Sequence, residues 1–303
     1  MHRNEETKSM NKHDKPAESL YETKDTDYTE LLDAAGAAFR HTVRKIISFL
    51  QLKPGMSILD IGTGNGYDLV DLAESVSPEG KIIGTEISEP HYAKSLQTIE
   101  ASPWKDQIDV QLCDVNDLEC PAESFDLVWC KYTLACFPDP LSSLKLIWKL
   151  VKRGGRVAVI NDLVPMHWLP ATLLGEDRAR ESRLYTAIFQ YIADYRSKRR
   201  KELQCCCSIS NTSCAGLMRQ AGFENLVSYT AVAEEVGELS EPLKKTLQLF
   251  LQRSFSEHMK DYLLPADWEF VQALRNRDSP HYLFNRHDLH IIKPITALIG
   301  YRS

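Results

Sequence analysis

The sequence lacks a hydrophobic run long enough to cross a membrane. None of its apolar stretches approaches the roughly 20 residues that a membrane-spanning helix needs. The N-terminal residues are polar and charged and contain no apolar signal region. We therefore expect residues 1–20 to be a disordered polar leader and residues 21–303 to fold. Together these absences favour a cytosolic, cytoplasmic protein.

The eight cysteines also lack a spacing suited to metal binding. No Cys-x-x-Cys pair occurs, and the consecutive residues 205–207 and nearby Cys214 have no histidine beside them. Adjacent cysteines cannot easily face one metal ion, and structural zinc sites use wider spacings. We interpret the cysteines as reduced thiols and predict no metal site. A metal or redox role for residues 205–214 is the alternative.

An excess of basic residues is missing as well. The chain has 36 Lys and Arg against 42 Asp and Glu, a net charge of −6 at pH 7. This balance argues against a broad nucleic-acid-binding surface. Residues 178–201 are the local exception, because basic residues there alternate with apolar ones at the spacing of an amphipathic helix. Its basic face is either solvated or a docking surface for an anionic partner.

The most informative segment is residues 59–66, which read Leu-Asp-Ile-Gly-Thr-Gly-Asn-Gly. An apolar strand over residues 57–61 leads into three glycines at alternate positions, and a helix-compatible stretch begins at Tyr67. Glycines allow positive φ and the close approach of a ligand, and a strand, a glycine turn and a helix together form a nucleotide-type cradle. A dinucleotide fingerprint would need its third glycine where the chain has Tyr67, which disfavours an NAD enzyme.

The run Asp60-x-Gly62-x-Gly64-x-Gly66 resembles motif I of class I S-adenosylmethionine (SAM)-dependent methyltransferases. The resemblance extends from about residue 50 to residue 161 and more faintly to the C-terminus. The nearest general likeness is the ubiquinone/menaquinone- and natural-product-type group. This resemblance implies an α/β, Rossmann-like, seven-stranded sheet with an antiparallel last strand. It also implies S-adenosyl-L-methionine as the methyl donor and S-adenosyl-L-homocysteine (SAH) as the product.

Strand and helix patterns follow in the order that this fold needs. Five β–α alternations in sequence favour a parallel sheet on physical grounds alone. A helix is predicted before the first strand and another before the fifth. The predicted strands cover residues 57–61, 81–86, 108–112, 125–130, 156–161, 225–232 and 295–302, and the two helices cover residues 28–50 and 141–151.

The resemblance implies a SAM site at the carboxyl ends of the strands. Glu86 would accept hydrogen bonds from both ribose hydroxyls, Ile87 would lie against the adenine, and Asp114 would accept from the adenine amino group. The residues expected to bind SAM are Asp60, Gly62, Thr63, Gly64, Gly66, Glu86, Ile87, Asp114, Val115 and Lys131.

A catalytic base is not marked in the same way. Residues 134–140 resemble the family's Leu-Glu-His-Leu-Pro-Asp-Pro segment, but Ala135 and Cys136 replace the usual Glu and His. No role of that His can therefore be transferred. His167, shortly after the fifth strand, is the candidate general base, and the alternative is a loop histidine packed on Trp168. The sequence assigns no catalytic residue beyond this candidate.

Two long insertions, at about residues 162–213 and 234–290, predict a helical cap over the carboxyl ends of the strands, where ligands bind in open α/β sheets. A cap suits a small organic acceptor methylated at an O, N or C atom. One alternative is a methyltransferase acting on protein or RNA through the basic helix 178–201. Another is a SAM-binding protein without methyl transfer. The amphipathic helices would serve a homodimer interface as readily as a cap.

Overall fold

The computed structural model describes residues 26–161, 166–168, 176–202 and 213–303. The predicted leader, residues 1–20, and the cysteines at 205–207 lie outside this part of the chain. Within it, no helix is long and apolar enough to cross a membrane.

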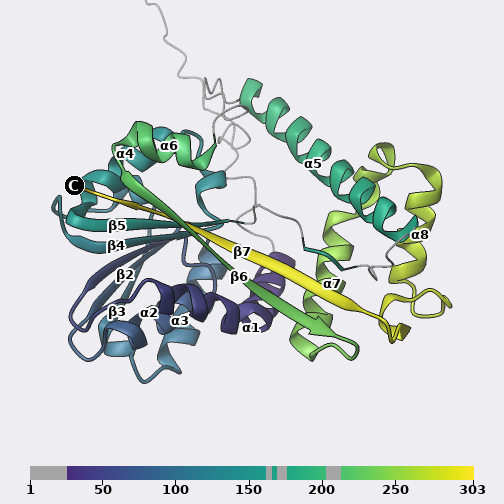
Figure 1. The fold of residues 1–303 in the computed structure, drawn as a ribbon, viewed down its shortest axis with the longest axis horizontal. Helices are drawn as coiled ribbons and strands as arrows, with labels where there is room; N and C mark the ends of the chain where they lie inside the picture. Colours follow the sequence, from purple (N-terminus) through teal and green to yellow (C-terminus); the bar gives the residue numbers. More distant parts are fainter. Residues whose placement is uncertain (1–25, 162–165, 169–175, 203–212) are drawn as a thin grey trace, which may run out of the picture.

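A seven-stranded sheet forms the centre of the molecule, with strand order β3-β2-β1-β4-β5-β7-β6 (Figure 1). Strands β1 to β5 pair in parallel, whereas β7 runs antiparallel to both β5 and β6. This confirms the predicted α/β sheet with an antiparallel last strand. The strands are β1 Ser57–Ile61, β2 Lys81–Glu86, β3 Ile108–Leu112, β4 Phe125–Lys131, β5 Val151–Asn161, β6 Glu224–Val236 and β7 His290–Tyr301.

Helices cover both faces of the sheet, and each face has its own hydrophobic cluster. Side chains of β4 alternate between the faces, so that Leu127 and Trp129 pack with one cluster while Val128 and Cys130 pack with the other. All four are buried, as expected for a central parallel strand. The helices on the first face are α1 Thr26–Phe49, α2 Tyr67–Val76 and α3 Glu89–Glu100, and those on the second are α4 Pro140–Leu150 and α6 Cys214–Ala221.

Strands β6 and β7 are longer than the sequence predicts. The predicted strands covered 225–232 and 295–302, but the antiparallel ladder continues outward to the pair Val236–His290. Strand β6 lies at the edge of the sheet and most of its side chains are at least partly exposed, so its hydrophobic pattern ends before its hydrogen bonding does. The extended pair carries the chain beyond the carboxyl end of β5, toward the helices of the insertions (Figure 1).

These outer helices share a third hydrophobic cluster, separate from the two that cover the sheet. We call this part the cap and define it as residues 166–168, α5 Glu176–Glu202, α7 Glu241–Ser254, the short helix η4 Glu257–Tyr262 and α8 Pro265–Arg275. Trp168 and Phe255 are completely buried in this cluster, beside Leu247 of α7 and Leu184 of α5. The cap lies on the side of the sheet where the parallel strands end (Figure 1).

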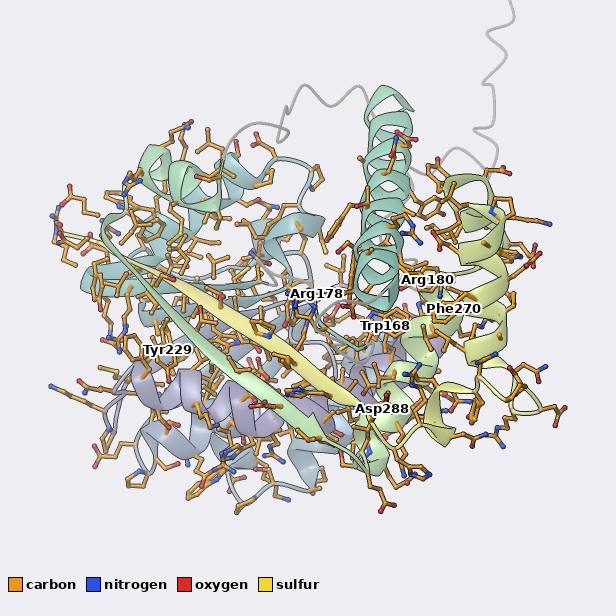
Figure 2. All side chains as sticks on the ribbon, turned by 45° about the vertical axis from the view of Figure 1, so that its right-hand side comes forward. Trp168, Arg178, Arg180, Tyr229, Phe270 and Asp288 are labelled. Carbon is orange, nitrogen blue, oxygen red and sulfur yellow. The ribbon has the colours of Figure 1, made fainter. Side chains whose placement is uncertain are left out.

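A buried carboxylate joins α5 to α8 in the cap. Asp267 accepts two hydrogen bonds of 2.7 Å from Arg183 and one of 3.2 Å from Arg180. The Arg180 guanidinium also stacks over the Phe270 ring, at 4.2 Å from its centroid, between α5 and α8 (Figure 2). Hydrogen bonding to Arg183, with a smaller contribution from Arg180, holds the pKa of Asp267 below its ordinary value.

Asp267→Asn is expected to destabilise the cap at neutral pH, and its effect is expected to shrink in acid. Because the folded-state pKa is below the unfolded value of about 4, the carboxylate contributes stability that is complete above about pH 5 and is lost as the pH falls through the folded-state pKa. Urea unfolding of both proteins between pH 3 and pH 7 checks this. An unfolding free-energy difference that stayed constant over that range would exclude the ion-pair role, and Asp278→Asn, at an exposed position, serves as control.

Candidate functional site

The glycine turn between β1 and α2 needs its glycines. Gly62, Gly64 and Gly66 have φ values of +72°, +55° and +83°, in the left-handed region that side chains disfavour. The N–H groups of Gly62 and Thr63 donate to the carbonyl of Thr85, which ties the turn to β2. A Cβ at Gly62 would lie 2.5 Å from Oγ1 of Thr133. Glycine at these positions therefore lets side chains of neighbouring segments pack directly on the turn.

Glu86, the last residue of β2, places a buried carboxylate beside this turn. Its Oε2 accepts from the Gly64 N–H at 2.8 Å, and its Oε1 accepts from the N–H groups of Ile87 and Ser88 at 2.9 Å each. A carboxylate offers about four acceptor positions, so Glu86 as found has one further position, on Oε2. This geometry accommodates one ribose hydroxyl, whereas accepting both requires the Gly64 N–H to give way.

A second carboxylate, Asp68, forms an ion pair beneath the turn. Lys131 Nζ lies 2.6 Å from Asp68 Oδ1, and the buried indole N–H of Trp129 donates to Oδ2 at 2.8 Å. Lys131, which the sequence places in the cofactor site, thus binds a residue that the sequence analysis missed. Asp68 stands in the first turn of α2, where an acidic side chain suits the helix dipole. An acidic residue just after the glycine turn, in the first turn of the helix, was the signal in the sequence that could have identified Asp68.

Asp60, at the carboxyl end of β1, is the third buried carboxyl group. No hydrogen bond reaches its side chain from the described residues. Burial, and next the negative charge of Asp68, raise the pKa of Asp60 well above its ordinary value, while Lys131 opposes this. The described charges around Asp60 therefore include more acidic groups than cations. A positively charged ligand held by the glycine turn would favour the ionised form of Asp60.

The residues predicted to hold an adenine ring lie on the next two strand ends. Ile87 is 48% exposed and so presents an apolar surface next to the buried Glu86. Asp114 accepts from the backbone N–H and the side-chain amide of Asn116 through Oδ1, at 2.8 and 2.6 Å. The Val115 side chain, next to Asp114, is buried in the core.

Helix α1 closes over the glycine turn through residues that the sequence analysis did not single out. Asp33 accepts from the Tyr67 hydroxyl at 3.0 Å and pairs with Lys94 at 3.2 Å. A Cβ at Gly36 of α1 would lie 2.5 Å from the Tyr67 ring. The bulky residue that replaces the third glycine of a dinucleotide motif is thus accommodated by a glycine on the neighbouring helix.

A strained residue marks the carboxyl end of β4. Tyr132 has φ +59°, which costs a non-glycine residue about 1–2 kcal/mol, and such conformations cluster at functional sites. Its N–H donates to the carbonyl of Ile160 at 2.8 Å. The Nζ of Lys293, from β7, lies 5.9 Å from the centroid of its ring. Tyr132 therefore lies between the glycine turn and the extended part of β7.

His167 pairs with a buried glutamate of α5. Its Nδ1 lies 3.0 Å from Oε2 of Glu181, and Oε1 of the same carboxylate accepts from the Trp168 N–H at 2.6 Å. The backbone of His167 also forms an antiparallel bridge with Ile292 of β7. The sequence analysis named His167 but not Glu181, because only the fold brings α5 over the chain after β5.

The basic face of residues 178–201 is partly engaged in ion pairs. Arg180 and Arg183 both pair with Asp267, although the Arg183 side chain is still 45% exposed. Arg178 is exposed as well (Figure 2). The side chains of residues 195–202 lie outside the described part. The described portion of the helix therefore does not present one continuous basic surface.

The described cysteines are free thiols, and burial raises the pKa of Cys214 to about 11. A thiol with this pKa stays protonated and unreactive at neutral pH. Across the described ranges, no group of three His, Cys, Asp or Glu side chains is arranged to hold a metal ion.

Comparison with known proteins places this site in a family. Residues 52–222, more than half of the chain, match the sequence profile of a family described as methyltransferase domain. The chain is 31% identical over 136 residues to a nocamycin O-methyltransferase of Saccharothrix syringae, covering 45% of this chain and 48% of that protein. It is 38% identical over 126 residues to a demethylmenaquinone methyltransferase of Symbiobacterium thermophilum, covering 40% and 49%. The matches thus span about half the length of these relatives.

Solved structures show the same fold at low sequence identity. A phosphoethanolamine N-methyltransferase 2 of Haemonchus contortus in complex with S-adenosyl-L-methionine aligns with a TM-score of 0.51 and 17% identity, over 92% of this chain and 58% of that one. A chain in the complex between the Trm112 methyltransferase activator and a methyltransferase of Haloferax volcanii aligns with a TM-score of 0.51 and 14% identity, over 92% and 95%.

Proposed function

The chain belongs to the family of methyltransferase domains, and from this premise we propose that it transfers the methyl group of SAM to a small organic acceptor. The observation that carries the proposal is the set of buried carboxyl groups around the glycine turn. Asp60 and Glu86 lie at the ends of neighbouring strands, and Asp60 is buried without a donor among the described residues. SAM carries a sulfonium and an ammonium group, which match this negative environment.

The roles of the remaining cofactor residues follow from their places in the site. The main chain of the turn at Gly62, Thr63, Gly64 and Gly66 would lie against the donor. Glu86 would bind a ribose hydroxyl through the acceptor position on Oε2, Ile87 would contact the adenine face, and Asp114 would accept from the adenine amino group. Lys131 would hold Asp68 in place beneath the turn. When bound, SAM supplies a methyl group on a positively charged sulfur, so transfer depends mainly on positioning the acceptor in line with it.

Two features support a small-molecule acceptor. The nocamycin and demethylmenaquinone enzymes are named for small organic acceptors. The cap with its own hydrophobic core stands at the carboxyl edge of the sheet, where it would cover a small acceptor and exclude water. Docking of RNA or protein through residues 178–201 is disfavoured because Asp267 neutralises Arg180 and Arg183 within the cap. A SAM-binding protein without transfer is the second candidate, favoured by Ala135 and Cys136 in place of the family's Glu and His.

Calorimetric titration with SAM, SAH and NADH tests the donor site. We expect micromolar binding of both adenosyl ligands and no binding of NADH. Incubation with methyl-labelled SAM and a small-molecule extract then distinguishes an enzyme from a binding protein, since only the enzyme transfers label. If neither adenosyl ligand bound to the folded protein, with or without the extract, the proposal would be wrong.

Gly62→Ala is expected to weaken SAM binding about 5–150-fold. A side chain at φ +72° is strained, and its Cβ would push Thr133 and the end of β4 away from the turn. Restoring the cradle on binding would cost roughly 1–3 kcal/mol. Gly237→Ala is the matched control, since Gly237 has φ +78° and open space around it. Both variants should lose stability, but equal SAM affinities would show that the turn does not hold the donor.

A further inference from the structure

The pair formed by His167 and Glu181 has the geometry of a positioned general base. Glu181 is 4% exposed, and its two oxygens are engaged by the His167 ring and the Trp168 N–H. A buried carboxylate that contacts Nδ1 favours the tautomer with its proton on Nδ1. The His167 side chain is 41% exposed. The other ring nitrogen, Nε2, is then left as the proton acceptor.

The fold places this pair beyond the carboxyl edge of the sheet. His167 bridges to Ile292, four residues before Thr296, which pairs with Asn161 at the end of β5. At about 3.3 Å per residue, His167 therefore lies about 13 Å beyond the end of that strand. Figure 2 shows the adjoining Trp168 beneath the first turns of α5, between the sheet and α8.

A series of contacts between residues runs from the position of His167 to the glycine turn. Lys293, next to Ile292, reaches over the Tyr132 ring at the end of β4. Thr133, next to Tyr132, is the residue that a Cβ at Gly62 would strike. His167 and the glycine turn are thus linked through β7 and the residues that follow β4.

We propose that His167 is the general base of the methyl transfer, that Glu181 is its positioning residue, and that the acceptor is a weakly acidic hydroxyl such as a phenol. This rests on the function proposed above. The hydroxyl oxygen forms the new O–CH₃ bond as the C–S bond of SAM breaks. The electron pair of that bond stays on sulfur, and the hydroxyl proton passes to Nε2 of His167 and then to water.

The charges nearby favour a hydroxyl over an amine. A phenol has a pKa of about 10 and is a poor nucleophile until it loses its proton, so a base is worth roughly 10²–10⁴ in rate. Lys293 brings a cation to the same rim, where it stabilises a developing phenolate and repels an ammonium. The Glu181 carboxylate stabilises the imidazolium that forms, as a buried carboxylate does for other histidine bases.

The tautomer of His167 can be tested without measuring methyl transfer. Nitrogen-15 NMR of histidine-labelled protein, with the His167 signals identified by their loss in His167→Asn, should show the proton on Nδ1 and a free Nε2. In Glu181→Gln the proton should distribute between both nitrogens. A proton on Nε2 in the wild-type protein would overturn the assignment.

The kinetic test uses phenol, 4-chlorophenol and 4-nitrophenol, whose hydroxyls are increasingly acidic, with aniline as an amine probe. With saturating SAM, His167→Asn should lower kcat about 10²–10⁴-fold for phenol but less than tenfold for 4-nitrophenol, which is already ionised at pH 8. The SAM affinity should not change. His167→Gly should regain phenol activity on addition of imidazole, and Glu181→Gln should follow the same acidity trend more weakly. His258→Asn, at an exposed histidine of the cap, is the matched control.

Each result separates this inference from the proposed function. Equal losses for all three phenols, or no rescue by imidazole, would give His167 a structural role only. A wild-type protein that binds SAM but methylates aniline alone, or none of the probes, would overturn the hydroxyl acceptor and leave the donor site intact. Absence of SAM binding would overturn the proposed function itself.

Discussion

Replacing Glu86 by alanine is expected to weaken SAM binding by about 1.5–3 kcal/mol, the usual range for hydrogen bonds to a charged group. This corresponds to about 10–150-fold in Kd. The variant loses the acceptor position on Oε2 that we propose binds a ribose hydroxyl, and it also releases the N–H groups of Gly64, Ile87 and Ser88. Calorimetric titration with SAM and SAH measures the loss.

A second ligand distinguishes two roles of Glu86, which are direct binding of a ribose hydroxyl and support of the glycine turn. With 2′-deoxy-SAH, which lacks one ribose hydroxyl, the effect of Glu86→Ala should be smaller by roughly 1 kcal/mol, since paired contacts are not additive. Glu79→Ala is the control, because Glu79 is exposed and precedes β2 at the opposite edge of the sheet. Equal losses for both ligands would limit Glu86 to holding the turn, and an unchanged affinity in the folded variant would remove it from the site.

Arg302→Ala is expected to lower the free energy of unfolding by about 3 kcal/mol, a large effect for one substitution. Arg302 is 6% exposed, and its Nη1 donates to the carbonyls of Trp148, Lys149 and Val151. Its Nη2 donates to Glu123 at 2.7 Å, and the guanidinium stacks on the Trp148 ring at 3.9 Å. Without it, the carbonyls of Trp148, Lys149 and Val151 lose a charged donor in a buried setting, although that of Lys149 keeps the Glu123 N–H.

Urea unfolding measures this loss, and two variants define its cause. Arg302→Lys keeps the charge but not the planar fork, so it should recover less than half of the lost stability. Arg219→Ala, at an exposed position on α6, should change the unfolding free energy by less than about 0.5 kcal/mol. Full recovery by lysine would show that charge alone matters at this position.

Features that depend on neighbours in the chain could be predicted from the sequence. The glycines at 62, 64 and 66 all have positive φ, as their spacing after an apolar strand indicates. The alternation of strands and helices predicted the parallel sheet, and the strand ends predicted which residues gather at its carboxyl edge. The limits of β6 and β7 were wrong, because the outer half of β6 is largely exposed and is held to β7 by backbone hydrogen bonds rather than by an apolar pattern.

Pairs formed by distant segments could not be predicted in this way. Asp68 with Lys131, His167 with Glu181, and Arg302 with the end of α4 each combine ordinary polar residues. Gly36 is compatible with any helix until the fold sets it against Tyr67.

The sequence by itself therefore determined the sheet and the glycine turn, because backbone conformation and hydrophobic periodicity are local properties. Only the tertiary structure decided the partners of the buried charges. A charged side chain is buried only where a complementary group meets it, and that meeting depends on how separate segments pack.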